Sequence, residues 1–273
     1  MEPLEVLFEA PDLPSRDLPD ELASLYGGTL GFETPRLVAN FVSSIDGVVA
    51  LEPLPGSSYV ISRGSEADRF VMGLLRASAD AILIGAGTMR ADPQAQWTPE
   101  FISPAHAKTF EEMRQRAAAG VRPALVVVTA SGNLDPGHPG LAAGATVFTT
   151  EEGRARLRKR VPPVVEVVPL GPGPALRAAA IVKALFERGH TMTLVEGGPS
   201  LVGALARERA LQELFLTVSQ VLAGRNGEGG RPSLVEGYQL PPPELGPARL
   251  LSVRRHGSHL FLRYELWAGA GPD

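Results

Sequence analysis

The sequence predicts a single α/β domain with a mainly parallel central sheet, helices on both faces and a C-terminal antiparallel hairpin. Apolar runs such as Ala81–Ile84 and Ala124–Thr129 are too short for helices and are typical of strands buried on both faces. Segments of helical periodicity alternate with these runs, which favours parallel pairing. Near the end of the chain, two further strands flank the turn His256–His259 and predict the hairpin.

The other elements are expected in an order that fits this architecture. The first strand is the run 37–42, which enters a turn at Ser43–Gly47. A helix starts after Ser65, where Asp68 three residues on resembles a capping box, and Pro104 opens another helix that Gly120 closes. Further strands are expected at 145–150, 164–170, 192–196 and 214–222, further helices at 175–188 and 199–207, and the hairpin strands at 250–253 and 260–267.

Composition limits the classes of function. The 273 residues are 44% apolar, enough to bury a sizeable core. The net charge is -4, and the 26 Lys and Arg are interspersed with 30 Asp and Glu, so we expect no nucleic-acid partner. The absence of cysteine excludes disulfides, thiolate metal sites and a Cys nucleophile. Without a signal peptide or a membrane-length apolar stretch, the sequence predicts a soluble, cytoplasmic protein.

Residues 1–33 differ from the rest of the chain. They are punctuated by proline and show little periodicity, which predicts an N-terminal extension that lies on the domain or is partly mobile. Residues 34–273 are expected to form the domain itself.

Two glycine-containing turns follow predicted strands. One is Gly85–Asp92 and the other is Glu196–Ser200. In an open α/β sheet, ligands bind beyond the carboxyl ends of the strands, and glycine lets the backbone approach a phosphate closely. Either turn alone could be an ordinary tight turn, but the pair predicts a dinucleotide site.

Other nucleotide and hydrolase motifs are absent from the sequence. Arg90 occupies the third glycine position of a G-x-G-x-x-G fingerprint, and no acidic residue follows at the usual distance, which argues against a standard Rossmann site. There is no Walker motif and no G-x-S-x-G elbow. NTPase and serine hydrolase functions are therefore not expected.

Four segments resemble a known family. NFVSSIDG from Asn40, LLRASADAILIGAGTMRAD from Leu74, LVEGGPSLVGAL from Leu194 and ELFLTVSQVLAG from Glu213 are similar to the reductase domain of the riboflavin biosynthesis deaminase-reductases and its freestanding relatives. The resemblance runs from about residue 36 to 267. It implies a dihydrofolate-reductase-like fold, NADPH as hydride donor, a homodimer, and reduction of a ribosylamino-pyrimidine 5′-phosphate to its ribitylamino form.

The resemblance also implies site residues. It places Glu196 and Asp46 at the reacting centre and substrate contacts at Asn40, Ser58 and Arg76. A carboxylate beside a protonated imine can stabilise it and move a proton, and we assign this role to Glu196, with Asp46 orienting the substrate or a loop. Cofactor contacts are implied at Gly85, Gly87, Thr88, Asp92, Ser131, Gly197, Gly198, Pro199, Ser200 and Leu201. No metal is expected, because the histidines form no H-E-x-x-H pattern.

Ordinary structural roles stay open for several of these residues. They are a turn for Asp46 and Ser131, a helix cap for Glu196, Thr88 and Asp92, and a solvated helix end for Arg76.

The chain also departs from the family pattern. Asn40 stands where the bacterial reductases usually carry Lys, and Pro93–Trp97 lacks the Arg that meets substrate phosphate, which Arg63 could replace. The sequence has no H-x-E or C-x-x-C, so no deaminase zinc site is expected. Two alternatives therefore stay open: an NADPH-dependent reductase of dihydrofolate or another pterin-like compound, and a non-catalytic NADP-binding paralogue.

Overall fold

The structure is a computed structural model that describes residues 1–117, 120, 122–227, 229–242 and 245–267. Its helices are α1 Asp20–Tyr26, α2 Ser57–Ile61, α3 Glu66–Ser78, α4 Ala86–Ala91, α5 Pro99–Ile102, α6 Ala107–Arg116, α7 Glu151–Leu157, α8 Ala178–Glu187 and α9 Pro199–Arg207. Its strands are β1 Glu5–Glu9, β2 Arg36–Ser43, β3 Ala81–Gly85, β4 Ala124–Thr129, β5 Ala145–Thr149, β6 Val165–Pro169, β7 Met192–Val195, β8 Glu213–Val218, β9 Ala248–His256 and β10 His259–Leu266.

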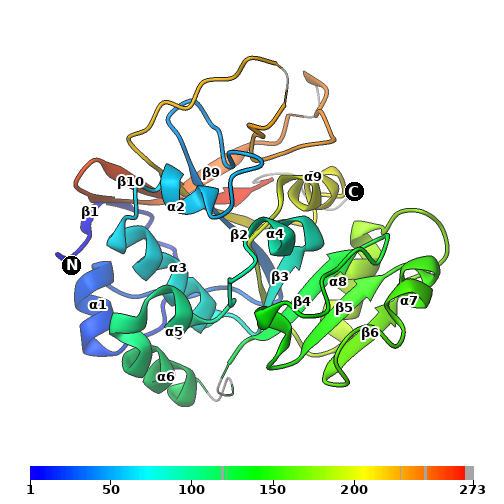
Figure 1. Cartoon of the computed structure of the whole chain (residues 1–273). Helices are drawn as coiled ribbons and strands as arrows, with labels where there is room; N and C mark the ends of the chain where they lie inside the picture. The colour runs from blue at the N-terminus through cyan, green and yellow to red at the C-terminus, as the bar shows by residue number, and fades with distance from the viewer. Residues whose placement is uncertain (118–119, 121, 228, 243–244, 268–273) are drawn as a thin grey trace.

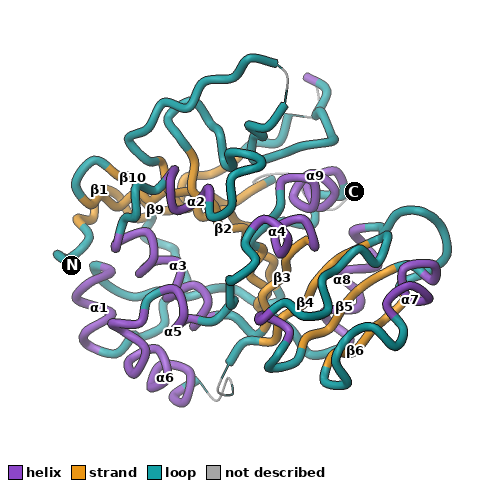
Figure 2. The backbone as a smooth tube through the Cα atoms, viewed as in Figure 1, coloured by secondary structure: helices purple, strands orange, loops and turns teal. Residues whose placement is uncertain are grey.

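All of these strands belong to one sheet, which crosses the whole molecule (Figures 1 and 2). Within the described residues its order is β1-β9-β10-β8-β2-β7-β3-β4-β5-β6. Pairing from β8 through to β6 is parallel, whereas β8 with β10, β10 with β9 and β9 with β1 are antiparallel. The predicted mainly parallel sheet with an antiparallel C-terminal hairpin is confirmed.

Helices cover both faces of the sheet, as predicted. One core cluster joins the inward side chains of α1, α3 and α6 to Val38, Ile82 and Leu194 of the sheet. The second cluster joins α8 and α9 to Leu37, Leu83 and Val195. Successive residues of a strand point to opposite faces of the sheet. The members of the two clusters therefore show to which face the next residue along each strand points.

Several predicted elements are shorter in the structure, and the strand expected at 214–222 and the helix expected at 175–188 show the physical reasons. β8 ends at Val218 because β2, its parallel partner, enters the turn at Ser44, after which the Ile45 N–H bonds to the Val221 carbonyl at 2.8 Å. Helix α8 starts at Ala178 because the Glu208 carboxylate accepts the N–H groups of Ala178 and Ala179, at 3.1 and 2.7 Å. The short helices α2, α4, α5 and α7 lack a full period of apolar residues, so the sequence did not reveal them.

Residues 1–33 contribute two regular elements. Strand β1 pairs with β9, where Glu5 lies opposite Arg255, and Leu22 and Tyr26 of α1 lie in the core cluster beside α3. Because β1 pairs with β9, the closing hairpin does not lie at the edge of the sheet. The side chains of β1 itself are exposed.

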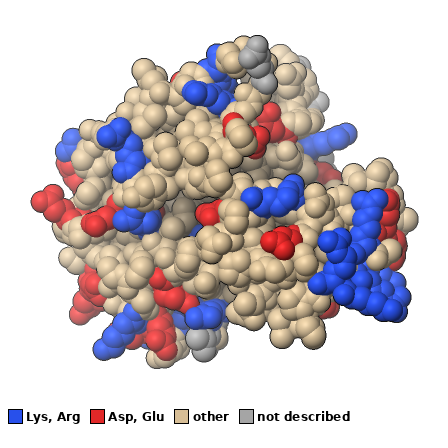
Figure 3. All heavy atoms as spheres, viewed as in Figure 1, with Lys and Arg blue, Asp and Glu red and all other residues tan. Residues whose placement is uncertain are grey.

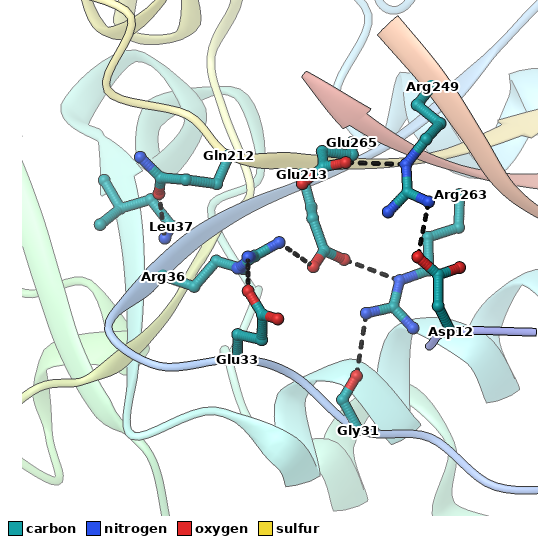
Figure 4. Close-up of polar contacts among 10 residues, drawn as sticks. All are labelled: Asp12, Gly31, Glu33, Arg36, Leu37, Gln212, Glu213, Arg249, Arg263 and Glu265. Carbon is teal, nitrogen blue, oxygen red and sulfur yellow. Dashed lines mark hydrogen bonds and ion pairs between the residues drawn. The ribbon is translucent and has the colours of Figure 1, made fainter. Parts of the chain in front are cut away.

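A buried ionic network fastens the start of β8 to its neighbours (Figure 4). Glu213, which is 1% exposed, accepts hydrogen bonds from Arg36 Nη1 at 2.6 Å and from Arg263 Nε at 2.7 Å. Arg263 also donates to the Gly31 carbonyl and lies over the rings of Phe32 and Phe215. One carboxylate therefore neutralises cations from β2 and β10.

Replacing Glu213 should destabilise the fold. In Glu213→Gln, Arg263 stays buried without an anion and Arg36 keeps only its exposed partner Glu33, and breaking a buried pair in this way costs about 3–5 kcal/mol. We expect urea denaturation to show a loss of this size. Glu33→Gln removes the exposed partner of Arg36 and should cost less than about 1 kcal/mol; equal losses in the two variants would contradict this prediction.

Candidate active site

Three parallel strands place polar side chains together at their carboxyl ends. Val38 of β2 lies beside Leu194 of β7, and Asn40 lies beside Phe215 of β8. By alternation, Asn40 points to the face that α3 covers, as do Glu196, just beyond β7, and Thr217 of β8. The sheet register therefore brings these three side chains to one edge beneath α3.

The two predicted glycine turns contact each other through their backbones. The Gly85 N–H donates to the Gly197 carbonyl at 2.7 Å. A Cβ added at Gly198 would lie 3.3 Å from Thr88 Oγ1, and one added at Gly197 would lie 3.3 Å from the Phe41 ring. Gly197 also has φ +98°, a conformation that side chains disfavour, and the Gly197–Gly198 peptide bond is cis. The turns therefore form one continuous cradle of bare backbone.

Glu196 is held beside this cradle by Arg76 of α3. The two side chains form a bidentate ion pair, with Nε to Oε1 at 2.8 Å and Nη2 to Oε2 at 2.7 Å, and they are 6% and 7% exposed. Arg76 Nη1 donates to the carbonyls of Gln96 and Thr98, both at 3.1 Å. Four of its five N–H groups are thereby used, so in this structure Arg76 fixes the carboxylate of Glu196.

Asp46 fastens two loops together. Its carboxylate accepts hydrogen bonds from the Ser44 hydroxyl and from the N–H groups of Ala223 and Gly224, at 2.6, 3.0 and 2.7 Å. The Ala223 N–H, followed by the Ser44 hydroxyl, holds the pKa of the Asp46 carboxyl well below its usual range. Asp46 therefore stays anionic and joins the turn after β2 to the loop after β8, which lie side by side (Figure 2).

Further cofactor candidates lie along the ends of β3 and β4. Arg90 of α4 donates to the Asn133 carbonyl at 2.8 Å, and Arg156 of α7 donates to the Ser131 carbonyl at 3.1 Å. The Asp92 carbonyl accepts from His138 at 3.0 Å. These contacts connect the segment that contains Gly87, Thr88 and Asp92 to the turn at Ser131.

The remaining predicted residues lie at the margins. Pro199 opens α9, Ser200 is exposed beside it, and Leu201 packs into the core beneath the helix. Ser58 is exposed on α2. The side chain of Leu201 points into the core, so its predicted cofactor contact would use the backbone, and the substrate contact of Ser58 stays a prediction.

Asp68 was missed as a site residue. The sequence identified only its capping contact, in which the Asp68 N–H bonds to Ser65 Oγ at 3.2 Å. Its carboxyl instead turns inward, is 7% exposed, and faces the Thr217 hydroxyl. Burial raises the pKa of Asp68 to about 6, although the Thr217 hydroxyl acts in the opposite direction. The sequence signal was an acidic residue on the apolar face of a helix.

Two other kinds of site are not found in the part of the chain that the structure describes. Among these residues, no group of three His, Cys, Asp or Glu side chains could hold a metal ion. In the same residues, no helix has both the length and the apolar character needed to cross a membrane.

A comparison with models of known protein families shows to which family the chain belongs. The profile of the RibD C-terminal domain matches residues 35–259, which is most of the chain. The chain belongs to the RibD C-terminal domain family. The resemblance stated from the four sequence segments is thus confirmed.

Curated relatives of this RibD C-terminal domain differ in length. The riboflavin biosynthesis protein RibD of Mycobacterium tuberculosis is 29% identical over 198 residues, 70% of this chain but 43% of that protein. The chain therefore spans less than half the length of this relative. A 2,5-diamino-6-ribosylamino-4(3H)-pyrimidinone 5′-phosphate reductase of Archaeoglobus fulgidus is 25% identical over 70% of this chain and 82% of its own.

Solved structures confirm the expected fold. A pyrimidine reductase-like protein of Corynebacterium diphtheriae has a TM-score of 0.63 and 22% identity, over 85% of this chain and 92% of its own. The riboflavin biosynthesis reductase of Saccharomyces cerevisiae has a TM-score of 0.58 and 15% identity, over 91% and 95%. The RibD C-terminal domain described here therefore has the reductase fold.

The raised pKa of Asp68 predicts a pH-dependent stability difference. The folded state holds this proton more tightly than the unfolded chain, so Asp68 costs nothing below pH ~4 and destabilises increasingly up to pH ~6. Relative to wild type, Asp68→Asn should gain up to about 3 kcal/mol between pH 4 and 7 in urea denaturation. Glu66→Gln, exposed on the same helix, should show no such change, and a pH-independent Asp68→Asn difference would refute the assignment.

Proposed function

We propose that this domain is an NADPH-dependent oxidoreductase that reduces a ribosylamino-pyrimidine 5′-phosphate to its ribitylamino counterpart. The observation that carries the proposal is the contact between the two glycine turns, with the Arg76-bound carboxylate of Glu196 directly after one of them. Family membership and the names of the relatives support the same chemistry. The proposal extends to this chain the activity that the name of the Archaeoglobus fulgidus reductase states.

The cradle fits a nicotinamide dinucleotide. A pyrophosphate needs bare backbone and N–H donors, and side chains at Gly197 or Gly198 would press on Phe41 and Thr88 instead. We assign its binding to Gly85, Gly87, Gly197, Gly198 and the N-terminal residues of α9, namely Pro199, Ser200 and Leu201. When bound, the cofactor supplies a hydride and leaves oxidised.

Preference for NADPH over NADH would come from the part of the proposed cofactor site at α7 and the turn at Ser131. Five exposed cations lie in and after α7: Arg154, Arg156, Arg158, Lys159 and Arg160. Figure 3 shows a group of blue side chains on the right of the molecule, the side on which α7 lies in Figure 1. Arg156 already contacts the turn at Ser131. An additional phosphate on the adenosine ribose would meet this positive charge, with Thr88 and Asp92 nearer to the nicotinamide.

Glu196 is assigned the chemical role. Opening of the ribose ring gives an imine that is protonated on its nitrogen. The imine carbon accepts the hydride, and the nitrogen keeps its proton as the product amine. A carboxylate held by Arg76 stabilises the cation before transfer and can deliver or take up the proton. Asp46 keeps the loops at 44–47 and 223–224 together, and Asn40 and Ser58 are assigned to the substrate side.

Cofactor binding can be tested by thermal denaturation. At 100 times its dissociation constant, NADPH should add about 2.7 kcal/mol of stability, and NADH should give a smaller shift at the same concentration. Gly197→Val should abolish the shift, whereas Gly137→Val, in an exposed loop, should preserve it. A shift that survives Gly197→Val would contradict the proposed cradle.

Turnover can be tested by NADPH oxidation at 340 nm. With a ribosylamino-pyrimidine phosphate as substrate, Glu196→Gln should lower kcat by roughly 10²–10⁴-fold, the usual contribution of a positioned acid or base. NADPH binding should persist in this variant. Turnover of dihydrofolate alone would favour the pterin-like alternative, and NADPH binding without any turnover would favour the non-catalytic one.

Assembly and location complete the proposal. We place the protein in the cytoplasm, since a chain without cysteine suits a reducing compartment. We also assign it a homodimer. Val6, Leu7 and Phe8 of the edge strand β1 are 43%, 49% and 44% exposed and offer an apolar contact for a second copy.

A further inference from the structure

Asp68 is a buried carboxyl group that the proposed mechanism does not use. It is 7% exposed and forms no ion pair within the described residues, although Arg69 and His259 are near enough to act on its charge. Thr217, the hydroxyl that it faces, is 3% exposed. A buried carboxylate without a direct ion pair is costly, so its presence beside a candidate active site favours a ligand that satisfies it.

The sheet places this pair on the same side as Glu196. On one side of β2, Ala39 pairs with Val195 of β7, the residue before Glu196. On the other side, Asn40 pairs with Phe215 of β8, and two residues further along Val42 pairs with Thr217. Glu196 and Thr217 thus come from strands on either side of β2, about 10 Å apart at the ordinary strand spacing. Asn40 lies between them, is 8% exposed, and its amide makes no hydrogen bond within the described residues.

The chemistry of this pair indicates what it would bind. A carboxylate only accepts hydrogen bonds, and its two oxygens match two parallel N–H donors. A 2-aminopyrimidin-4-one presents such a fork through its ring N–H and its 2-amino group. A uracil presents a carbonyl oxygen at that position, which would face the carboxylate and leave it unsatisfied.

We propose that Asp68, supported by Thr217, binds the 2-amino edge of the pyrimidine and makes the enzyme selective for a 2,5-diaminopyrimidinone over the corresponding aminouracil. The inference rests on the proposed function and names its substrate class. The ribosylamino end of the substrate then extends past Asn40 to Glu196. Although burial raises the pKa of Asp68 to about 6, the carboxyl is mostly ionised at neutral pH and able to accept both donors.

The test measures kcat/KM for NADPH oxidation with both ribosylamino phosphates, the 2,5-diaminopyrimidinone and the 5-aminouracil. Wild type should prefer the diaminopyrimidinone by about 100-fold or more, because a site built around buried polar groups rejects a ligand that leaves them unpaired. Asp68→Asn should lose at least about 100-fold on this substrate and less than about fivefold on the uracil. Thr217→Val should show the same selective loss, about tenfold.

Controls separate selectivity from stability and from the proposed function. Glu66→Gln, at an exposed position two residues before Asp68 on α3, should leave both kcat/KM values unchanged, and each variant should retain its NADPH-dependent thermal shift. Equal losses on both substrates in Asp68→Asn, or a wild-type preference for the uracil, would overturn the inference alone. A wild type that reduces neither of these compounds nor dihydrofolate would overturn the proposed function and the inference together.

Dihydrofolate is tested as a third substrate, because it presents the same 2-amino edge of a pyrimidine ring. Dihydrofolate carries a 2-amino-4-oxo pyrimidine ring without the ribosylamino group. Reduction of dihydrofolate alone, lost in Asp68→Asn, would support the edge assignment and refute the ribosylamino substrate.

Discussion

The bidentate pairing of Arg76 with Glu196 is the interaction on which the geometry of the site depends. It joins α3 to the end of β7, and the same guanidinium holds the carbonyls of Gln96 and Thr98. The segment 93–97, where the chain departs from the family pattern, thus helps to hold Arg76 in place and, through Arg76, the carboxylate of Glu196. Trp97 anchors this segment by packing against His138, with ring centroids 5.7 Å apart. Removing either charge would leave the other buried and unpaired.

Three carboxylates near the site have different environments, and these suggest different tasks. Asp46 is satisfied by backbone N–H groups and a hydroxyl and Glu196 by a guanidinium, whereas Asp68 faces a hydroxyl and forms no ion pair with the nearby Arg69 or His259 within the described residues. Groups of one chemical type can divide structural, catalytic and binding roles when their surroundings stabilise the charge to different degrees. The position of each carboxylate relative to the carboxyl ends of β2, β7 and β8 follows from the sheet register.

Local patterns made the central part of the fold predictable. The runs at 81–84 and 124–129 and the glycines at 85 and 197 carry their structural meaning within a few residues, so strands and turns could be recognised. The pairing of Arg76 with Glu196 joins residues 120 positions apart, and the sequence could not distinguish it from a solvated helix end. Asp68 resembles part of a cap because its N–H does cap the helix, while its carboxyl faces β8. Strand β1 was missed because its exposed side chains lack alternation.

The pairing of β1 with β9 has a consequence for synthesis of the chain. Glu5 pairs with Arg255, 250 residues later, so β1 cannot join the sheet until nearly all the described residues have left the ribosome. Such non-local contacts slow folding. Until β9 is available, the nascent β1 segment stays unpaired with the apolar side chains of Val6, Leu7 and Phe8 exposed. The acidic residues that border them, Glu5 and Glu9, would then act as gatekeepers against misassociation.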